Sequence, residues 1–403
     1  MNLVICNMSN TSDWRRGIVN RNYFVVRELI RSPLVERVLL VDFLAVSSVH
    51  KSFGRRRTAR YLAELVGSKH GQRLGWRHKI SRDSRWNVGD KPVYVLSGLG
   101  FPSHLPKDVD LLKKVMLEHG FGPEQTVLWS YNAFVPEFFT IPAALKIFDA
   151  VDNWSLHASY KREAARLQQN YARIGQSADL IFTVSDGLKN LFPARKSVWV
   201  PNGVDLANFS AQTHIPEDMS RLKRPVIGYV GTVQERLDFT LLQHVCRSHA
   251  DKSFVFIGPV WGGVQSEVNE LVSACPNVHF LGRRRYEDVP AYLSAMDAAI
   301  IPHRLDAFIS STNPMKMYDY LAAGKPVVTT SGAGTEQFSG VMHVVNGAEA
   351  FSQAIHLALQ ETGDIWTEKR RQAVLGHTWT ARVQAMISEI KKHSPEFAKI
   401  KED

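Results

Sequence analysis

Short apolar, β-branched runs alternate with helical patterns along the whole chain, and this alternation limits the possible folds more than any other sequence feature. Such runs are typical of parallel sheets with crossover helices, whose strands are buried on both faces. The sequence therefore predicts an α/β protein. The predicted strands form two series, 2–6, 37–43, 92–96, 126–130, 145–149, 180–183 and 197–200, then 225–231, 253–257, 277–281, 298–302, 326–329 and 342–344.

The alternation is interrupted between the two series, and 403 residues suffice for two hydrophobic cores. We therefore predict two Rossmann-like domains, at 1–205 and 224–376, joined by a linker at 206–223. Residues 377–403 are expected to form a C-terminal helix that crosses back to the first domain.

Composition favours a soluble globular protein, with 44% apolar and 22% charged residues. No apolar run reaches the roughly 18 residues of a transmembrane helix, and the N-terminus lacks the layout of a signal peptide. Cys6, Cys246 and Cys275 lie far apart and lack metal-ligand spacing. These features predict a cytoplasmic protein without a metal site.

The net charge of +10 is concentrated in residues 51–91, which hold twelve basic and only three acidic side chains. Large apolar and indole side chains are interleaved with the cations, a mixture that suits an anionic membrane surface. A solvated basic loop is the alternative, and nucleic acid is disfavoured because no binding motif accompanies the charge. We expect peripheral association with the inner face of the cell membrane through Arg55, Arg56, Arg57, Arg60, Trp76 and Trp86.

The stretch 302–328 is the most informative. A buried strand ends at Pro302, and a helix is expected to begin near Asn313 or Pro314, with the Asn or a Thr as its cap. The N-terminus of such a helix favours a phosphate, to which Lys316 in the first turn adds a full charge. Asp319, one turn later, is placed to accept hydrogen bonds from ribose hydroxyls.

This stretch resembles the nucleotide-sugar glycosyltransferases of the GT-B fold, especially the large retaining group that includes sucrose and mannosyl transferases. Those enzymes carry two acidic residues eight positions apart, ahead of a Gly-x-Pro-Val-Val segment. Asp319 matches the second acid, but Ser311 occupies the position of the first. The Asn-Pro-x-Lys-x-Tyr-Asp-Tyr form is similar to bacterial exopolysaccharide and teichuronic-acid glycosyltransferases. The resemblance implies two Rossmann-like domains facing across a cleft and transfer of a hexose from a nucleotide-sugar, with a UDP-sugar expected.

Further segments match the same family, namely 178–185, 200–205, 228–231 and 277–284. Gly231 is expected to let backbone approach the phosphates, although it also suits a plain turn. Arg283 and Arg284 fit the segment that meets the nucleobase, or are surface charges. The predicted donor-binding residues are Gly231, Thr232, Arg236, Arg283, Arg284, His303, Ser311, Thr312, Asn313, Lys316 and Asp319.

The first domain is expected to hold the acceptor and any catalytic base, which would take the proton of an acceptor hydroxyl. Asp152 follows a strand, in a segment that also resembles the xanthan-type membrane-associated glucuronosyltransferases, where a carboxylate acts as base. Asp149 and His157 are the substitutes, and a helix cap is the other interpretation of Asp152. In the polar loop 7–17, Arg15, Arg16 and Gly17 are candidates for the acceptor or the donor phosphates.

Two questions stay open at this point. Asp152 as base implies inversion, whereas the Asp319 pattern is commoner among retaining enzymes. Ser311 with nearby His303 or Arg304 would tolerate a carboxylate, which suggests a UDP-uronic acid donor.

The expected partners are a nucleotide-sugar, a lipid-linked or polysaccharide acceptor and an anionic membrane surface. No metal or cofactor is expected, because Arg236, Lys316 and the helix N-terminus suit the leaving diphosphate. The alternatives are a UDP-sugar epimerase of the same fold and a non-catalytic sugar-binding or scaffold protein.

Overall fold

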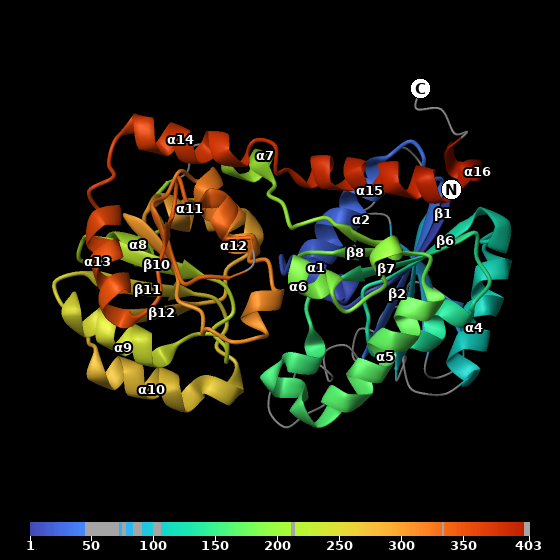
Figure 1. Cartoon of the computed structure of the whole chain (residues 1–403), viewed down its shortest axis with the longest axis horizontal. Helices are drawn as coiled ribbons and strands as arrows, with labels where there is room; N and C mark the ends of the chain where they lie inside the picture. The colour runs from blue at the N-terminus through green and yellow to red at the C-terminus, as the bar shows by residue number, and fades with distance from the viewer. Residues whose placement is uncertain are drawn as a thin grey trace. The chain divides into compact units, whose positions relative to one another are not determined.

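The computed structural model describes residues 1–44, 72–74, 78–83, 91–99, 106–210, 214–332 and 334–398. The chain forms two compact units, Met1–Val200 with Arg382–Asp403, and Pro201–Ala381 (Figure 1). The first unit thus ends at Val200, where the sequence predicted an end at 205. Helix α15 (Trp379–His393) begins in the second unit and continues into the first.

The described residues of the first unit form a nine-stranded sheet in the order β3-β4-β5-β2-β1-β6-β7-β8-β9. Its strands from β5 to β9 pair in parallel, whereas β3 and β4 are antiparallel at one edge. These two edge strands were not predicted, and they lie inside the basic segment 51–91. The strands are β1 (Asn2–Cys6), β2 (Arg37–Leu44), β3 (Gln72–Arg73), β4 (His78–Arg82), β5 (Val93–Leu99), β6 (Thr126–Ser130), β7 (Leu145–Ala150), β8 (Leu180–Thr183) and β9 (Ser197–Trp199).

Helices pack on the sheet of the first unit because its strand side chains alternate between two buried faces. Val4 and Cys6 of β1 belong to one apolar cluster with α4 and α5, whereas the alternate residues Leu3 and Ile5 are buried on the opposite side. The helices are α1 (Thr11–Arg15), α2 (Arg21–Arg31), α4 (Pro106–Glu118), α5 (Ala164–Ser177), α6 (Asp186–Lys189) and α16 (Pro395–Ala398).

The second unit contains a parallel sheet in the order β12-β11-β10-β13-β14-β15. Phe254 and Phe256 pack in the apolar cluster that includes α9, α10 and α13, whereas Val255 and Ile257 pack in the cluster that includes α11 and α12. The sheet is therefore covered on both faces. The strands are β10 (Val226–Val230), β11 (Ser253–Ile257), β12 (Val278–Gly282), β13 (Ala298–Ile301), β14 (Val327–Thr329) and β15 (His343–Val344).

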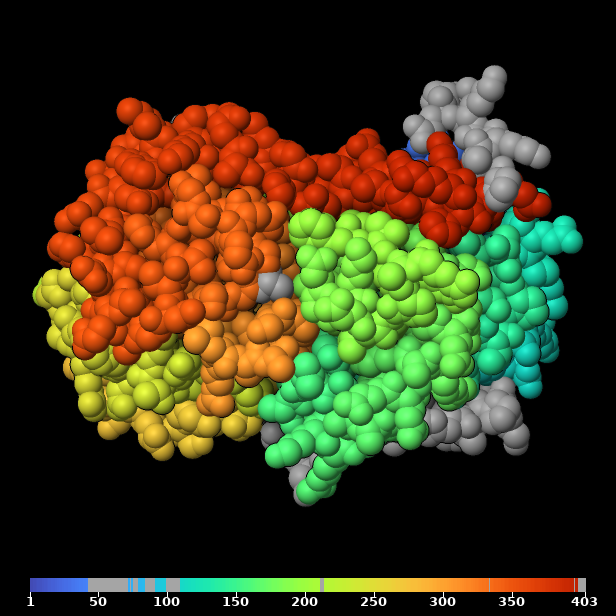
Figure 2. All heavy atoms as spheres, in the orientation of Figure 1, coloured from blue at the N-terminus to red at the C-terminus, as the bar shows by residue number. Residues whose placement is uncertain are grey.

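Helices α9 and α10, yellow in the space-filling view, form a continuous outer surface of the second unit (Figure 2). No helix among the described residues is long and apolar enough to cross a bilayer. The helices of this unit, besides the start of α15, are α7 (Leu206–Phe209), α8 (Glu217–Ser220), α9 (Phe239–Ser248), α10 (Gln265–Ala274), α11 (Val289–Ser294), α12 (Met315–Ala322), α13 (Ala348–Ala358) and α14 (Asp364–Val374).

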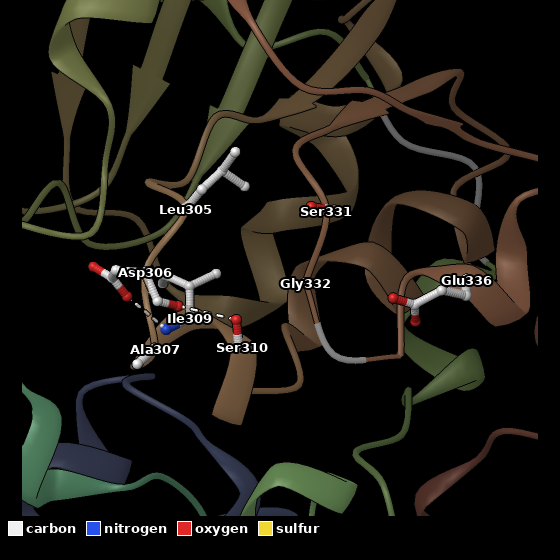
Figure 3. Close-up of a pocket in the computed structure, with 8 residues that line it drawn as sticks. All are labelled: Leu305, Asp306, Ala307, Ile309, Ser310, Ser331, Gly332 and Glu336. Atoms are coloured by element: carbon white, nitrogen blue, oxygen red, sulfur yellow. Dashed lines mark hydrogen bonds between the residues drawn. The ribbon is translucent and has the colours of Figure 1, made fainter.

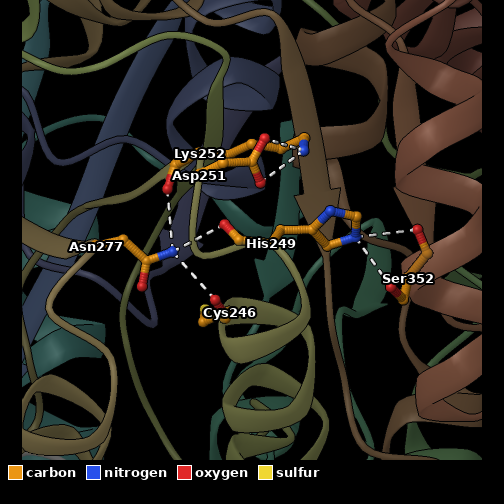
Figure 4. Close-up of polar contacts among 6 residues, drawn as sticks. All are labelled: Cys246, His249, Asp251, Lys252, Asn277 and Ser352. Carbon is orange, nitrogen blue, oxygen red and sulfur yellow. Dashed lines mark hydrogen bonds and ion pairs between the residues drawn. The ribbon is translucent and has the colours of Figure 1, made fainter.

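A polar cluster closes the C-terminal end of α9 (Figure 4). The Asn277 side-chain amide donates to the carbonyls of Cys246, His249 and Lys252 at 3.0–3.1 Å. The His249 ring nitrogen Nε2 lies 2.9 Å from the Ser352 hydroxyl on α13. Carbonyl groups that a helix end leaves unpaired are satisfied in this way.

Candidate donor-binding site

Two glycines bring the ends of β10 and β11 close together. Gly231 directly follows β10 with φ 146°, and its N–H donates to the Ile257 carbonyl at 2.8 Å. Gly258, with φ 153°, lies so near that an added Cβ would stand 2.0 Å from the Gly231 oxygen. A side chain at either position would fill this space. Bare backbone therefore lines the carboxyl end of the sheet, where ligands of such sheets bind.

The loop after Gly231 is fastened to the segment that follows β13. The Asp238 N–H donates to the Pro302 carbonyl at 2.9 Å, and the Arg304 N–H donates to the Arg236 carbonyl at 2.8 Å. The Arg236 guanidinium lies 5.6 Å from the centre of the Phe308 ring. Arg236, predicted near the diphosphate, is thus held between the ends of two strands.

Lys316 reaches the same place from the first turn of α12. Its Nζ lies 5.0 Å from the centre of the Tyr229 ring, and its Cε would stand 3.0 Å from a Cβ added at Gly231. Helix α12 begins at Met315 after Pro314, with no side-chain cap. Its first N–H groups therefore lack a side-chain acceptor at the cap, an arrangement that favours an anion.

Asn313 has a structural role that the sequence did not predict. Its side-chain oxygen accepts from the Asn202 N–H at 2.8 Å and from the Tyr318 hydroxyl at 3.1 Å, and the Asn202 amide donates to its carbonyl at 2.6 Å. The prediction that Asn313 or a Thr caps the helix is wrong, because Pro314 occupies the cap position. Instead, Asn313 ties the start of α12 to the segment that opens the second unit.

The hydroxyl groups of Ser311 and Thr312 also have hydrogen-bond partners within the chain. Both are buried in and after the 3₁₀ turn Ile309–Ser311. The Ser311 hydroxyl donates to the Phe308 carbonyl at 2.7 Å, and the Thr312 hydroxyl donates to the Ile309 carbonyl at 2.9 Å. These hydrogen bonds are local contacts of the turn. They use the hydroxyl protons of two residues that were predicted to bind the nucleotide-sugar.

His303, two residues after β13, is 1% exposed. Its main chain is anchored, since its N–H and carbonyl both bond the Thr330 hydroxyl. Neither ring nitrogen has a hydrogen-bond partner among the described residues. Burial lowers the pKa of His303 well below its usual value, and the nearby Lys316 and Arg236 lower it further, so the ring is neutral.

Asp319 lies one turn after Lys316 in α12 and is partly buried. The Tyr286 hydroxyl donates to its Oδ1 at 3.3 Å. Burial raises the pKa of Asp319 to about 7, Tyr286 and Lys316 oppose this shift, and the carboxylate of Asp205 adds to it. A carboxyl with such a pKa changes its charge near neutral pH.

The two arginines predicted near the nucleobase differ in their contacts. Arg284 pairs with Asp218 at 2.6 Å and lies over the Tyr292 ring, to whose hydroxyl it also donates. Arg283 is exposed. Arg284 is therefore engaged in a structural ion pair with α8, and the expectation of a donor contact gains no support from its geometry.

A pocket opens beyond the ends of β13 and β14, between residues 305–310 and 331–336 (Figure 3). Asp306 and Glu336 line it and give it an acidic character. Of the two residues expected to pair with a uronate, His303 is neutral, whereas Arg304 donates through Nε to the Leu237 carbonyl at 3.2 Å.

The candidate bases of the first unit have different surroundings. Asp149 is fully buried and accepts from Arg21 Nε at 2.9 and 3.1 Å. His157 Nδ1 accepts from the Ser159 N–H at 3.1 Å and caps the next 3₁₀ turn. Both therefore have structural roles.

Asp152 remains partly exposed, with its carbonyl bonded by the Tyr171 hydroxyl at 2.9 Å. Asn153, and not Asp152, caps the adjacent 3₁₀ turn. The cap interpretation of Asp152 is therefore wrong.

The loop 7–17 is not wholly irregular as predicted, because residues Thr11–Arg15 form α1. The carboxylate of Asp42 at β2 organises this segment by accepting from the Asn7 amide and from the N–H and hydroxyl of Thr11. Arg15 pairs with Asp83 at 3.4 Å, Arg16 pairs with Asp13, and Gly17 has φ 71°. Both arginines thus have carboxylate partners within the chain.

The predicted membrane residues Arg55, Arg56, Arg57, Arg60, Trp76 and Trp86 lie outside the described residues. Within the part of segment 51–91 that the structure describes, Lys79 is buried on β4 and the Lys91 ammonium donates to the Ile30 carbonyl at 3.0 Å.

Sequence reasoning did not single out several residues that shape the candidate donor site. Tyr229 faces Lys316, Tyr286 and Asp205 act on Asp319, and the Tyr320 hydroxyl accepts from the Val230 N–H at 2.7 Å. Gly258 had a usable signal, because it directly follows the predicted strand 253–257. Thr232, predicted to bind the donor, has its carbonyl bonded by the Tyr229 hydroxyl at 3.1 Å.

Residues 224–361 match the family described as glycosyl transferases group 1. The chain is 28% identical over 271 residues to the putative teichuronic acid biosynthesis glycosyltransferase TuaH of Bacillus subtilis, covering 62% of this chain and 68% of that protein.

Solved structures of similar fold include Anabaena Alr3699/HepE in complex with UDP and glucose, with a TM-score of 0.63, 15% identity and coverage of 97% and 99% of the two chains. Sucrose-phosphate synthase from Thermosynechococcus elongatus gives a TM-score of 0.67, 12% identity and coverage of 97% and 98%. The predicted GT-B fold is confirmed. The chain is a glycosyltransferase of the GT-B fold, and its residues 224–361 are similar to the glycosyl transferases group 1 family.

Proposed function

We propose that this glycosyltransferase moves a hexose from a UDP-sugar to a lipid-linked or polysaccharide acceptor during synthesis of a cell-surface polysaccharide. The donor part of the proposal is carried by Lys316 beside Gly231 and by Arg236 over Phe308, in the segments that follow β10 and β13. The similarity to TuaH, whose name refers to teichuronic acid, and to HepE, which was solved with UDP and glucose, supports the acceptor and donor classes.

In the reaction, the bond between the anomeric carbon and the diphosphate oxygen breaks, and its electron pair leaves with UDP. A hydroxyl oxygen of the acceptor forms the new bond to that carbon. Arg236, Lys316 and the N–H groups at the start of α12 offset the negative charge that develops on the leaving diphosphate. The carboxyl of Asp319 accepts from a ribose hydroxyl. Asp152 of the first unit is the candidate acceptor of the hydroxyl proton if the reaction inverts the anomeric centre.

We propose a neutral hexose in preference to a uronic acid, because Asp306 and Glu336 line the pocket next to the site. A thermal-shift panel of UDP-, GDP- and dTDP-sugars that includes UDP-glucose and UDP-glucuronate tests the donor directly, since a ligand that binds only the folded state raises its unfolding temperature. The largest shift is expected with a neutral UDP-hexose. A larger shift with UDP-glucuronate would contradict the neutral donor, and a larger one with a GDP-sugar would contradict UDP.

The catalytic proposal is tested by Lys316→Ala and Asp319→Ala in the whole chain. If the protein is a transferase, the variants lose turnover and nucleotide binding. If it is a scaffold protein, its non-catalytic role is unaffected by these substitutions.

The membrane part is tested by co-sedimentation with anionic vesicles, which compares the wild type with a variant in which Arg55, Arg56 and Arg57 are replaced by Gln. Unchanged sedimentation of the variant would contradict a membrane role for these arginines.

A further inference from the structure

A buried imidazole without hydrogen-bond partners stands next to the two cations of the donor site. His303 is 1% exposed, and both of its ring nitrogens lack a partner among the described residues. Leaving a buried polar group unsatisfied costs about 1–3 kcal/mol, so a native structure seldom retains two such atoms on one ring without a use for them.

The second unit contains a second buried histidine for comparison. His249 is 8% exposed, and its Nε2 lies 2.9 Å from the Ser352 hydroxyl and 3.2 Å from the Ser352 carbonyl (Figure 4). Packing in this domain thus provides partners for a ring nitrogen of a buried histidine that serves the fold. His303 has no such arrangement, although Thr330 fixes its main chain firmly.

The charged groups around His303 indicate which ligand group its ring contacts. Arg236 and Lys316 are close enough to lower its pKa, and both have long, flexible side chains. When these cations contact a diphosphate, they bring the phosphate oxygens to the imidazole. The pocket lined by residues 305–310 begins two residues further along the chain.

The two ring nitrogens of a neutral imidazole need different hydrogen-bond partners. One ring nitrogen carries a proton and donates, and the other only accepts. Phosphate oxygens at neutral pH are acceptors, so they need the N–H. The accepting nitrogen needs a donor, and sugar hydroxyls are the donors that a nucleotide-sugar offers on the side away from the base.

We infer that His303 hydrogen-bonds the bound donor through both ring nitrogens, one donating to a diphosphate oxygen and the other accepting from a hydroxyl of the transferred sugar. This inference rests on the proposed function and adds a residue that distinguishes the intact nucleotide-sugar from the free nucleotide. The ring contributes to donor recognition and not to the stability of the unliganded fold.

Calorimetric titration of His303→Phe with UDP and with UDP-glucose tests the inference. Each lost hydrogen bond is expected to weaken binding by roughly tenfold. The affinity for UDP should therefore fall about tenfold and the affinity for UDP-glucose about a hundredfold. His303→Gln, which keeps one donor and one acceptor, is expected to recover most of the UDP-glucose affinity.

The unfolding temperature without ligand distinguishes ligand binding by His303 from a structural role. If the ring stabilised the fold, His303→Phe would lower this temperature. His303→Phe removes two unsatisfied atoms at similar volume, so this temperature is expected to stay unchanged or rise. The matched control His249→Phe is expected to lower the unfolding temperature and leave both affinities within about twofold.

Three results would overturn the inference: a lower unfolding temperature or failure to fold for His303→Phe, unchanged affinities, or equal losses for UDP and UDP-glucose. If the wild type binds neither UDP nor UDP-glucose, the proposed function itself is contradicted.

Discussion

The carboxyl ends of the strands carry charged or polar side chains in both units, but these side chains are used differently. In the first unit, Asp42 and Asp149 are buried and satisfied within the chain, by Asn7 and Thr11 and by Arg21. In the second unit, Lys316 lies against the bare backbone of Gly231, and Arg236 lies over the Phe308 ring. Both cations act electrostatically on His303, whose ring has no partner among the described residues. Charged groups near the strand ends thus stabilise the fold in the first unit, whereas in the second unit they surround a ring that no described residue satisfies.

The largest expected effect on stability is in the first unit. Arg21→Met leaves the carboxylate of Asp149 buried without its cation, which is expected to lower the free energy of unfolding by about 3–5 kcal/mol. Urea denaturation measures the change. The double variant Arg21→Met/Asp149→Leu removes both charges and is expected to recover most of the loss. A single variant as stable as the wild type would contradict a structural role for the pair.

The largest expected effect on activity is in the second unit. Lys316→Met keeps the aliphatic stem but removes the charge, which is expected to lower kcat/KM by roughly 10²–10³-fold, the loss typical of one electrostatic contact to a transition state. Steady-state kinetics with the best donor of the panel measures it. The unfolding temperature should change little. Wild-type kcat/KM in the variant would contradict a role for Lys316 in the site.

Asn313 provides an intermediate case, because it lies beside the site yet serves the fold. Asn313→Ala deprives the buried Asn202 N–H of its acceptor, which is expected to destabilise the protein by about 1–3 kcal/mol. In Thr312→Val, only a local hydrogen bond is lost, and we expect a change below about 1 kcal/mol. Equal unfolding free energies for the two variants would contradict the larger structural role of Asn313.

The last expected effect concerns pH and follows from the raised pKa of Asp319. The unfolded chain releases this proton near pH 3.8, whereas the folded protein holds it up to about pH 7. The contribution of this group to stability is therefore fully present below pH 3.8 and is lost as pH rises towards 7. The stability of Asp319→Asn relative to the wild type should rise over this interval, as chemical denaturation at several pH values can measure. A constant difference would contradict the raised pKa.

The fold was largely predictable because buried parallel strands carry a strong local signal. Strands 2–6, 126–130, 180–183 and 253–257 were predicted with the bounds that the structure shows. The hairpin of β3 and β4 was missed, because its short strands lie in a basic segment and owe their place to pairing with β5.

The candidate site was predictable where function follows from position along the chain. Gly231 and Arg236 follow β10, and Lys316 and Asp319 lie in the first two turns of α12. Residue order alone indicates such places. The roles of Asn313 and Arg284 depend on partners more than 60 residues away, Asn202 and Asp218, which no local pattern reveals. Likewise, no residue pattern distinguishes a satisfied histidine such as His249 from an unsatisfied one such as His303.

The most direct test of the account is calorimetric titration of UDP into the wild type, the double variant Arg236→Met/Lys316→Met and the control Arg284→Met. If the donor diphosphate lies between Gly231 and α12, the double variant should bind UDP at least a hundredfold more weakly, whereas Arg284→Met should bind within about threefold of the wild type. Wild-type affinity in the double variant, or an equal loss in the control, would contradict the proposed donor site.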